Sequence, residues 1–231
     1  MYLKVPGLLI CAVYLFITAG CATFRSDLGG EFAGEAVRND EAEKARVLFV
    51  FSHIKQSTGF DVIPKLEGPN EKISDFEDIF GDALNELSNI KSYATFTNYA
   101  SDVNEPDRRA LKDSLISQND YILDIRILRK NSFAKHFLAQ FFSVLSLTTL
   151  PMPYAWSYSI TVDVYLSPDN VMKSYKRNVS LTRWVQTFLV FLQPFHFERR
   201  KKEEIYIEFF HDIFRQIETE KVLVKEISAS R

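Results

Sequence analysis

Residues 156–181, WSYSITVDVYLSPDNVMKSYKRNVSL, decide the fold that we predict for this chain. The first half of the stretch alternates along the chain, so that one side is made of Trp156, Tyr158, Ile160, Val162, Val164 and Leu166. A period of two is typical of a strand with one buried face. Residues 167–170 have the composition of a tight turn, and 171–181 alternates again. The stretch therefore predicts a β-hairpin.

Strand and helix patterns alternate in the residues before the hairpin. The apolar run 47–54 is typical of a buried strand, and 121–127 alternates like a strand with one wet face. Apolar residues spaced by three and four predict a helix over 74–91, which Ser74 and Glu77 open as a capping box. Residues 92–98 suit a strand, and Pro106 opens a helix that ends near Asn119.

After the hairpin, residues 200–221 carry a broad apolar stripe at helical spacing, made of Ile205, Phe209, Ile213 and Ile217. The order of elements predicts an α+β fold. We expect a single mixed sheet of about five strands with helices packed on it, an apolar insert and a C-terminal amphipathic helix. No linker divides the chain after residue 46, so 46–231 is predicted to be one domain.

Two uncharged apolar runs, 137–150 and 184–197, flank the hairpin. Because hairpin strands are antiparallel, the end of the first run and the start of the second are expected at the same end of the sheet. A helical run of about 14 residues reaches about 21 Å, short of a hydrocarbon core of about 30 Å. Pro151, Pro153 and Pro194 also interrupt the runs, so neither is expected to span a bilayer.

The two runs allow three interpretations. They form core over the sheet, they dip into a membrane, or they dock on a protein partner. Basic residues flank them, which an interfacial membrane contact would use, although acids such as Glu203 and Glu204 would also pair with these. The candidate contact residues are Phe137, Phe141, Phe142, Leu145, Leu150, Trp156, Trp184, Phe188, Phe191, Phe195, Arg199 and Arg200.

The chain starts with a pattern typical of a signal peptide, in which Lys4 precedes an apolar run that ends at residue 20. Residues 17–21, ITAGC, resemble the lipobox of bacterial lipoproteins, with Thr18 in place of the usual branched aliphatic residue. The resemblance implies that 1–20 is removed and that Cys21 is acylated and becomes the first residue of the mature chain. Since Ala22 is not Asp, it also implies an outer-membrane location facing the periplasm.

Composition limits the partners. The 231 residues hold 28 basic and 30 acidic side chains, a net charge of −2, which gives no basic field for nucleic acid. The two cysteines are Cys11 and Cys21, so the mature chain has no pair to oxidise. Residues 21–45 hold glycines and charges without apolar periodicity, and we expect a lipid anchor and flexible tether there.

No catalytic signature emerges, and we expect neither an enzyme, a metal site nor a cofactor. His53, His136, His196 and His211 lack metal-ligand spacing. There is no GxSxG, P-loop or GxGxxG motif. Asp120 and Asp124 share a strand face, and Asp163 on the hairpin would complete a carboxylate pair for acid–base chemistry, but Arg126, Lys173 and Arg177 would equally neutralise these acids.

The sequence thus predicts a membrane-anchored envelope lipoprotein that binds or assembles through an apolar surface, with the bilayer and an envelope protein as the expected partners. The lipobox, the Thr149-Leu150-Pro151 insert and the aromatic run ending in Pro-Phe are together similar to uncharacterised envelope lipoproteins of Gram-negative bacteria. Two alternatives stay open: a periplasmic carrier or chaperone with an apolar cavity between the runs, and a cell-wall-directed hydrolase with Asp124 and Asp163 in a cleft.

Overall fold

The computed structural model describes residues 21–35, 37–38, 43–68, 76–146, 149–167, 170–186 and 198–224. Its centre is one mixed sheet of seven strands, so the α+β class is confirmed and the predicted count of about five is low. The strands are β1 (Cys21–Arg25), β2 (Ala45–Thr58), β3 (Lys65–Leu66), β4 (Ile90–Asn98), β5 (Tyr121–Ser132), β6 (Met152–Ser167) and β7 (Asn170–Val185).

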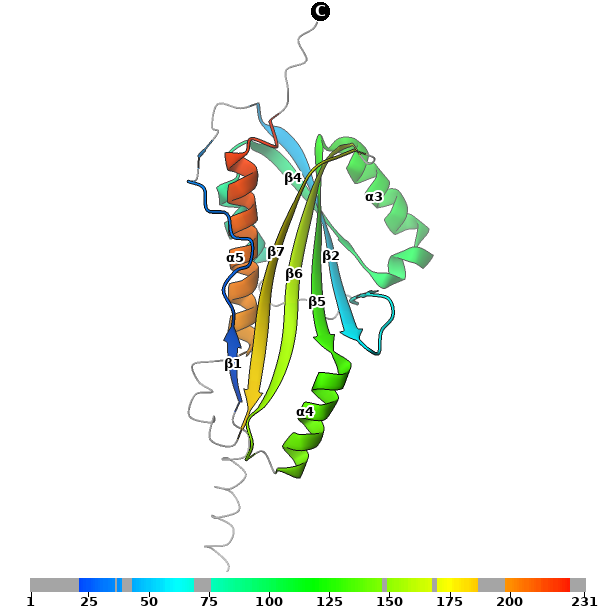
Figure 1. Ribbon diagram of the computed structural model, residues 1–231. Coiled ribbons are helices and arrows are strands. Elements are labelled where there is room, and N and C mark those ends of the chain that lie inside the picture. The colour runs from blue at the N-terminus through cyan, green and yellow to red at the C-terminus, as the bar shows by residue number, and fades with distance from the viewer. Residues whose placement is uncertain are drawn as a thin grey trace, which may run out of the picture.

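The sheet order is β1-β7-β6-β5-β2, and β3 and β4 share the outer edge of β2 (Figure 1). β2 is parallel to β4 and β5, whereas the other pairs are antiparallel. The predicted hairpin is confirmed as β6 and β7, which extend beyond the predicted ends at residues 156 and 181. The turn residues 168 and 169 lie outside the described residues.

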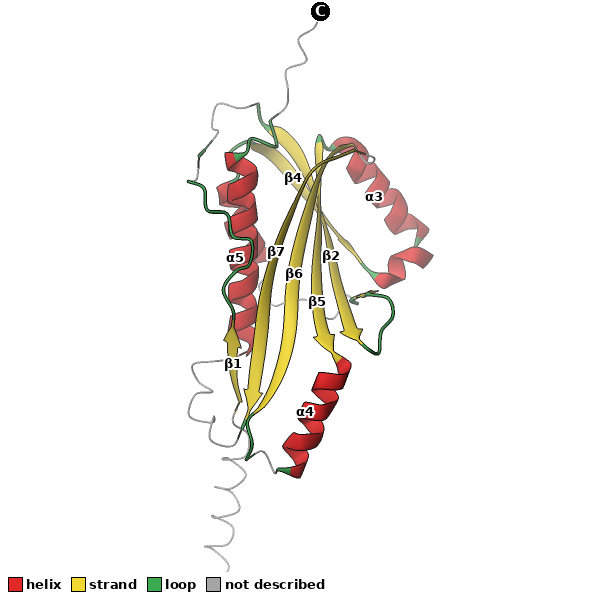
Figure 2. Cartoon of the chain, viewed as in Figure 1, coloured by secondary structure: helices red, strands yellow, loops and turns green. Residues whose placement is uncertain are grey.

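Four α-helices accompany the sheet in the described part of the chain (Figure 2): α2 (Phe76–Ala83), α3 (Pro106–Gln118), α4 (Phe133–Leu145) and α5 (Glu198–Thr219). α2 and α5 pack on one face, where alternate residues of the strands point. α3 covers part of the other face, over a small cluster around Leu48, Val50, Phe96 and Ile122. α4 lies apart from both layers, at one end of the sheet.

The main core lies between the sheet and the α2–α5 layer and is strongly aromatic. Phe80 of α2 meets Phe49 and Phe51 of β2 edge to face, with ring centroids 5.0 and 5.1 Å apart. Phe210 and Phe214 of α5 add rings from the other helix, and both are fully buried. Edge-to-face contacts of this kind add to the free energy gained by burying the rings.

The helix predicted over 74–91 is shorter in the structure. α2 ends at Ala83, a 3-10 turn covers Leu84–Glu86, and β4 begins at Ile90. The backbone of Asn89 accepts a hydrogen bond from Ala45 N at 2.9 Å, and its side chain donates to Leu223 O at 2.7 Å. These distant partners hold Asn89 outside a helix. Ser74, half of the predicted capping box, lies outside the described residues.

The alternation predicted for the hairpin fails at Leu166. Tyr158, Ile160, Val162 and Val164 are buried as expected, whereas Leu166 is 51% exposed. The register between β6 and β7 shifts at Tyr165, on both sides of that residue. A bulge turns the following side chain to the opposite face, which explains why Leu166 leaves the buried side.

The flexible tether predicted for residues 21–45 is wrong for residues 21–35. Cys21–Arg25 forms β1, which pairs with β7 from Cys21↔Val185 to Arg25↔Leu181. Gly29 then pairs with Asn178, and Phe32 N donates to Asp212 Oδ1 of α5 at 2.9 Å. Composition did not reveal these contacts because every partner lies more than 145 positions later in the chain.

Candidate functional site

Several segments that are distant in sequence meet at one end of the sheet. Thr58, the last residue of β2, pairs with Ser132, the last residue of β5. Beyond that pair β6 and β7 continue to the pair Met152↔Val185, and Cys21 at the start of β1 pairs with the same Val185. The position of the expected acyl anchor, the last turn before β6 and the whole of α4 therefore lie at this end (Figure 1).

α4 turns its small residues inward and its large apolar residues outward. Ala139 and Ser143, four residues apart, are its buried positions. Phe137 is 59% exposed and Leu145 65% exposed. The other large apolar residues of the helix that face solvent are Phe133, Leu138, Phe141, Phe142 and Val144. A helix with its bulky face in water is unusual in a globular fold and indicates a contact surface.

The N-terminal half of α4 is fixed to β5 and β6. Ser132 Oγ caps the helix by accepting a hydrogen bond from Lys135 N at 3.5 Å. His136 Nε2 lies 2.9 Å from the backbone oxygen of Ala155, and the imidazole ring meets Trp156 edge to face at 5.1 Å. These contacts lie on one side of α4, and the large apolar residues of its outer face are exposed.

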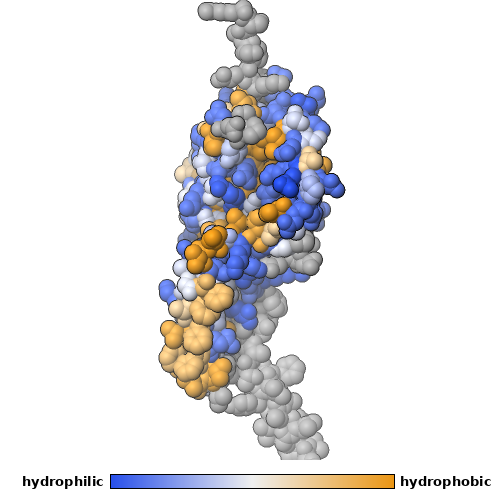
Figure 3. Space-filling model, turned by 90° about the vertical axis from the view of Figure 1, so that its right-hand side faces the viewer, coloured by the Kyte–Doolittle hydropathy of each residue, from blue (hydrophilic) through white to orange (hydrophobic). Residues whose placement is uncertain are grey.

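A second segment extends the apolar surface. This segment is residues 59–63, the tip between β2 and β3. Its side chains Phe60, Val62 and Ile63 are 69%, 93% and 72% exposed. The Phe60 ring stacks on Phe133 at 5.3 Å, and Phe133 stacks on Phe137 at 6.2 Å. We call the outer face of α4 together with residues 59–63 the apolar end. Figure 3 shows its α4 part as an apolar protrusion.

The apolar end agrees with part of the predicted contact set. Phe137, Phe141, Phe142, Leu145 and Leu150 are all exposed, so the interpretation of this run as core is wrong for them. The tip 59–63 was missed, although three apolar residues between Gly59 and Pro64 were a readable signal.

The tryptophans differ from the exposed phenylalanines. Trp156 is partly buried, and it packs against the main core as well as against His136 of α4. Trp184 is half-buried in β7, where it pairs with Pro153 on one side and Ala22 on the other. The expected meeting of the two runs is confirmed by this pairing and by the 3.2 Å hydrogen bond from Gln186 Nε2 to Thr149 O. Phe188, Phe191 and Phe195 lie outside the described residues.

Acidic neighbours neutralise most of the basic side chains that follow the second run. Arg199 pairs with Glu203 at 2.8 Å, Lys201 with Glu204 at 2.8 Å, and Lys202 with Glu198 at 2.5 Å. Burial alone would raise the pKa of Glu198, but the hydrogen bond from Lys202 and the neighbouring charges outweigh it and lower this pKa. Arg200 is exposed in the first turn of α5.

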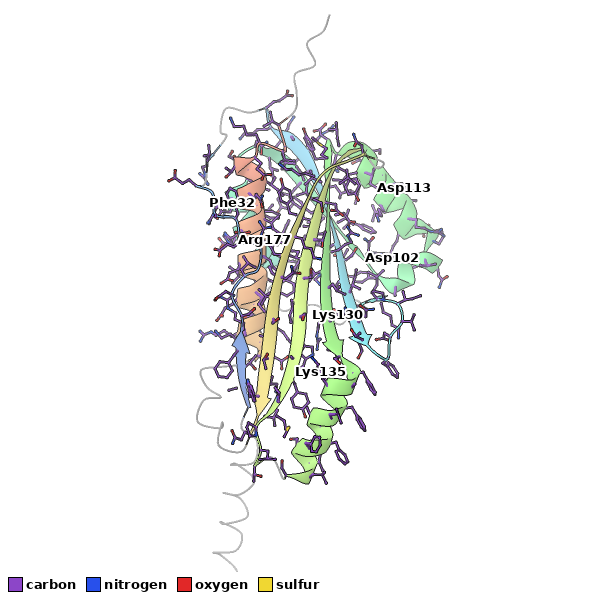
Figure 4. All side chains as sticks on the ribbon, viewed as in Figure 1. Phe32, Asp102, Asp113, Lys130, Lys135 and Arg177 are labelled. Atoms are coloured by element: carbon purple, nitrogen blue, oxygen red, sulfur yellow. The ribbon has the colours of Figure 1, made fainter. Side chains whose placement is uncertain are left out.

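Around α4 the basic side chains are Arg129, Lys130 and Lys135. Arg129 lies over the Trp156 ring at 5.8 Å. Lys130 and Lys135 are exposed at the junction of β5 and α4, next to the apolar end (Figure 4). These two lysines are therefore the cations best placed beside the apolar end.

The candidate catalytic carboxylates form an ion-pair network. Asp124 and Asp163 face one another across β5 and β6, and Arg126 hydrogen-bonds Asp163 and lies 3.7 Å from Asp124. Burial raises the pKa of Asp124, and the charge of Arg126 offsets part of that rise. Asp120 Oδ2 accepts a hydrogen bond from Arg46 N at 2.9 Å. Arg126 thus contacts both acids and offsets part of their charge, as one interpretation of the sequence expected. Lys173 instead pairs with Glu220 and Arg177 with Asp212.

The histidines with described surroundings have structural partners. His211 contacts Glu86 at 2.9 Å and Asp82 at 3.2 Å, and His53 stacks beside Tyr206. His196 lies outside the described residues. Over the described ranges, no three His, Cys, Asp or Glu side chains are grouped as metal ligands. None of the described helices combines the length and the apolar character needed to cross a membrane.

Comparisons with known proteins give no family. No family model matches the chain, and no curated protein matches it. Among solved structures, a PelC dodecamer from Paraburkholderia phytofirmans is similar over 86% of this chain and 97% of that chain, with 11% identity and a TM-score of 0.31. A putative homologue of a neuraminyllactose-binding hemagglutinin from Helicobacter pylori is similar over 87% of this chain and 94% of that chain, with 9% identity and a TM-score of 0.32. We draw nothing about function from likenesses this distant.

Proposed function

We propose that this chain is an envelope lipoprotein, acylated at Cys21 and held at the outer membrane on its periplasmic side, which works by binding through the apolar end. The occupant that we propose for the apolar end is the bilayer that holds the acyl chains. The observation that carries the proposal is the shared position of Cys21 and α4 at one end of the sheet.

The pairing of β1 with β7 supports a placement of this end of the sheet at the bilayer. Because β1 begins at Cys21, no flexible tether separates an acylated thiol from the sheet. β6 extends past Trp156 by residues 152–155, roughly 13 Å at about 3.3 Å per residue. α4 has 13 residues, is about 20 Å long and contacts β6. An acyl chain on Cys21 would therefore bring the C-terminal half of α4 to the headgroup region.

The energy of the contact suits a reversible interfacial interaction. A large apolar side chain gains about 1.5–3 kcal/mol on full burial, so each half-exposed Phe or Leu of α4 would gain roughly 1 kcal/mol. Several such side chains strengthen an acyl anchor, and α4 is too short to cross the hydrocarbon core. Lys130 and Lys135 would add an attraction to anionic headgroups.

The anchor is tested by mass spectrometry of the protein isolated from its native envelope. We expect a mature chain that begins at Cys21 and carries a diacylglyceryl group. Cys21→Ser should remove the modification and release the chain from the membrane fraction. An unmodified thiol at residue 21 would overturn the proposal.

The bilayer contact is tested with unacylated Cys21→Ser protein and vesicles that contain anionic lipid. The variant Phe137→Ser/Phe141→Ser should co-sediment several-fold less than its parent. The matched control is Val103→Ser/Leu111→Ser, because these residues are 73% and 51% exposed on the α3 side of the molecule. Equal loss in both variants, or no binding by the parent at low salt, would contradict a bilayer contact through α4 and favour a protein partner.

A further inference from the structure

The tip between β2 and β3 carries one charge in an otherwise uncharged stretch. Residues 56–64, QSTGFDVIP, contain Asp61 as their one ionisable side chain. The neighbouring side chains of Phe60 and Val62 are largely exposed, whereas that of Asp61 is 12% exposed. The carboxylate is therefore turned away from the apolar side of the tip and toward the atoms of the tip itself. A charge in this position needs hydrogen-bond partners, which the turn supplies.

The partners of Asp61 close the turn at the end of β2. Asp61 Oδ2 accepts a hydrogen bond from Ser57 N at 3.1 Å, and Oδ1 accepts one from Lys65 Nζ at 2.6 Å. Asp61 N donates to Ser57 O at 2.7 Å, and Phe60 N donates to the same oxygen at 3.0 Å. Gly59, with φ of 93°, allows the chain to turn at this point. One carboxylate thus joins the end of β2 to the start of β3.

This turn determines where the apolar side chains of the tip lie. Phe60, which shares the Ser57 carbonyl with Asp61, stacks its ring on Phe133 of α4 at 5.3 Å. Phe133 stacks in turn on Phe137 at 6.2 Å. The closed turn therefore brings the tip and α4 together as one apolar surface.

The ion pair also compensates a charge that would oppose an anionic bilayer. The hydrogen bonds from Lys65 and from Ser57 N lower the pKa of Asp61, so the carboxylate is ionised at neutral pH. An uncompensated carboxylate would be repelled by anionic headgroups. The ammonium group of Lys65 lies against this carboxylate and offsets its charge.

We propose that Asp61 is a positioning residue of the apolar end, which holds the tip against α4 and presents Phe60, Val62 and Ile63 to the bilayer. The inference rests on the proposed bilayer contact. Asp61 acts through the shape of the turn and not by touching lipid. Removing its side chain should therefore loosen the tip, whereas an amide in its place should preserve the tip because it still accepts from Ser57 N.

NMR of the unacylated Cys21→Ser protein without lipid tests the positioning alone. The parent should show nuclear Overhauser contacts between the rings of Phe60 and Phe133 and slow amide exchange at Ser57. Asp61→Ala should lose both signals with the rest of the spectrum unchanged, and Asp61→Asn should keep them. Asp113→Ala is the matched control, because it removes a carboxylate on α3 (Figure 4). Unchanged ring contacts in Asp61→Ala would overturn the positioning role.

Co-sedimentation with anionic vesicles then separates shape from charge. Asp61→Ala should bind about fivefold less than the parent, the change expected when roughly one apolar side chain no longer reaches the lipid, and Asp61→Asn should bind at least as well as the parent. Gly59→Ala, which strains the turn but keeps the carboxylate, should bind as weakly as Asp61→Ala.

Two outcomes of the vesicle experiment would contradict the inference in different ways. Tighter binding by both Asp61→Ala and Asp61→Asn would overturn the role in shape, because the charge alone would then control binding. Failure of the parent to bind would overturn the bilayer contact on which the inference rests, whereas the NMR comparison would still decide whether Asp61 positions the tip.

Discussion

Arg177 and Asp212 form a buried ion pair between β7 and α5. Their exposed fractions are 4% and 8%, and Arg177 Nε lies 2.5 Å from Asp212 Oδ2. Arg177 also donates to Gln216, and Asp212 accepts from Phe32 N at 2.9 Å. Gly30, with φ of 85°, allows the intervening backbone to pass close to the Lys176 oxygen, where a Cβ would come within 3.1 Å. This pair therefore holds the segment after β1 on α5 (Figure 4).

Removing one member of that pair should destabilise the protein strongly. Arg177→Met leaves the Asp212 carboxylate buried without its cation, and such changes typically cost about 3–5 kcal/mol. Urea denaturation should show the loss, and Arg177→Met/Asp212→Asn should recover part of it because the unpaired charge is gone. A double variant less stable than Arg177→Met would contradict this account.

Asp124 and Asp102 should respond oppositely to substitution and to pH. Burial raises the pKa of Asp124, so its charge opposes folding, and stability gained at this site appears as the pH falls through its folded pKa. Hydrogen bonds from Arg108 and from Tyr99 N outweigh burial at Asp102 and lower its pKa, so stability there is lost as the pH falls through the folded value.

At pH 7 we therefore expect Asp102→Asn to lower the free energy of unfolding and Asp124→Asn to leave it unchanged or raise it. Urea melts at pH 7 and pH 4 provide the measurement. The loss caused by Asp102→Asn should shrink at the lower pH, where the carboxylate is partly protonated in the unfolded chain. A large destabilisation by Asp124→Asn at pH 7 would show that its pairing with Arg126 exceeds the cost of burial.

At the scale of the element, α4 separates residues that stabilise the fold from residues that are free to bind. Ala139 and Ser143 are its buried residues, and their small size allows the close approach of α4 to the sheet, where it contacts β5 and β6. Phe141 and Leu145 face water. The buried side of the helix thus carries small side chains, and the large apolar ones lie on the exposed side.

Substitutions on the two sides of α4 should have different costs. Phe141→Ser or Leu145→Ser should change the free energy of unfolding by no more than about 0.5 kcal/mol, as for other exposed positions. Ala139→Phe should cost about 1–3 kcal/mol because it overpacks a buried position of the helix. Thermal denaturation of the three variants checks this, and a large loss for Leu145→Ser would mean that the outer face is packed.

At the scale of the whole molecule, the long sheet has two unlike ends. Cys21 and α4 lie at one end, and the β6–β7 turn, next to Asn170, lies at the other. An acyl anchor with no tether before β1 would therefore orient the domain with its long axis away from the bilayer.

This orientation is measurable with spin labels on the acylated protein bound to vesicles. A nitroxide at Leu145→Cys should be shielded from a water-soluble paramagnetic reagent, whereas one at Met172→Cys near the opposite end should be accessible. Removing the anchor by Cys21→Ser should reduce the difference. Equal accessibility of the two labels in the acylated protein would contradict the proposed orientation.

Local pattern determined much of the architecture. The sequence predicted the hairpin, the strand from Tyr121 and the apolar stripe of α5. In each of them apolar residues recur with a period of two or of 3.6 residues within one continuous segment. The exposed residues of the first apolar run, from Phe137 to Leu150, were also identified as candidates from the sequence. Whether they formed core or surface was not decided by that pattern, since apolar residues have the same periodicity on either kind of face.

Tertiary structure alone decided the rest. β1 exists because β7 offers an edge, the tip at Phe60 joins α4 through ring stacking, and Trp156 is partly buried because it packs against the core and His136. Arg126 joins Asp124 and Asp163 across two strands. Each of these outcomes depends on a partner far away in the chain. A residue's local sequence determines which conformations it favours, but its burial and charge pairing depend on what the completed fold places against it.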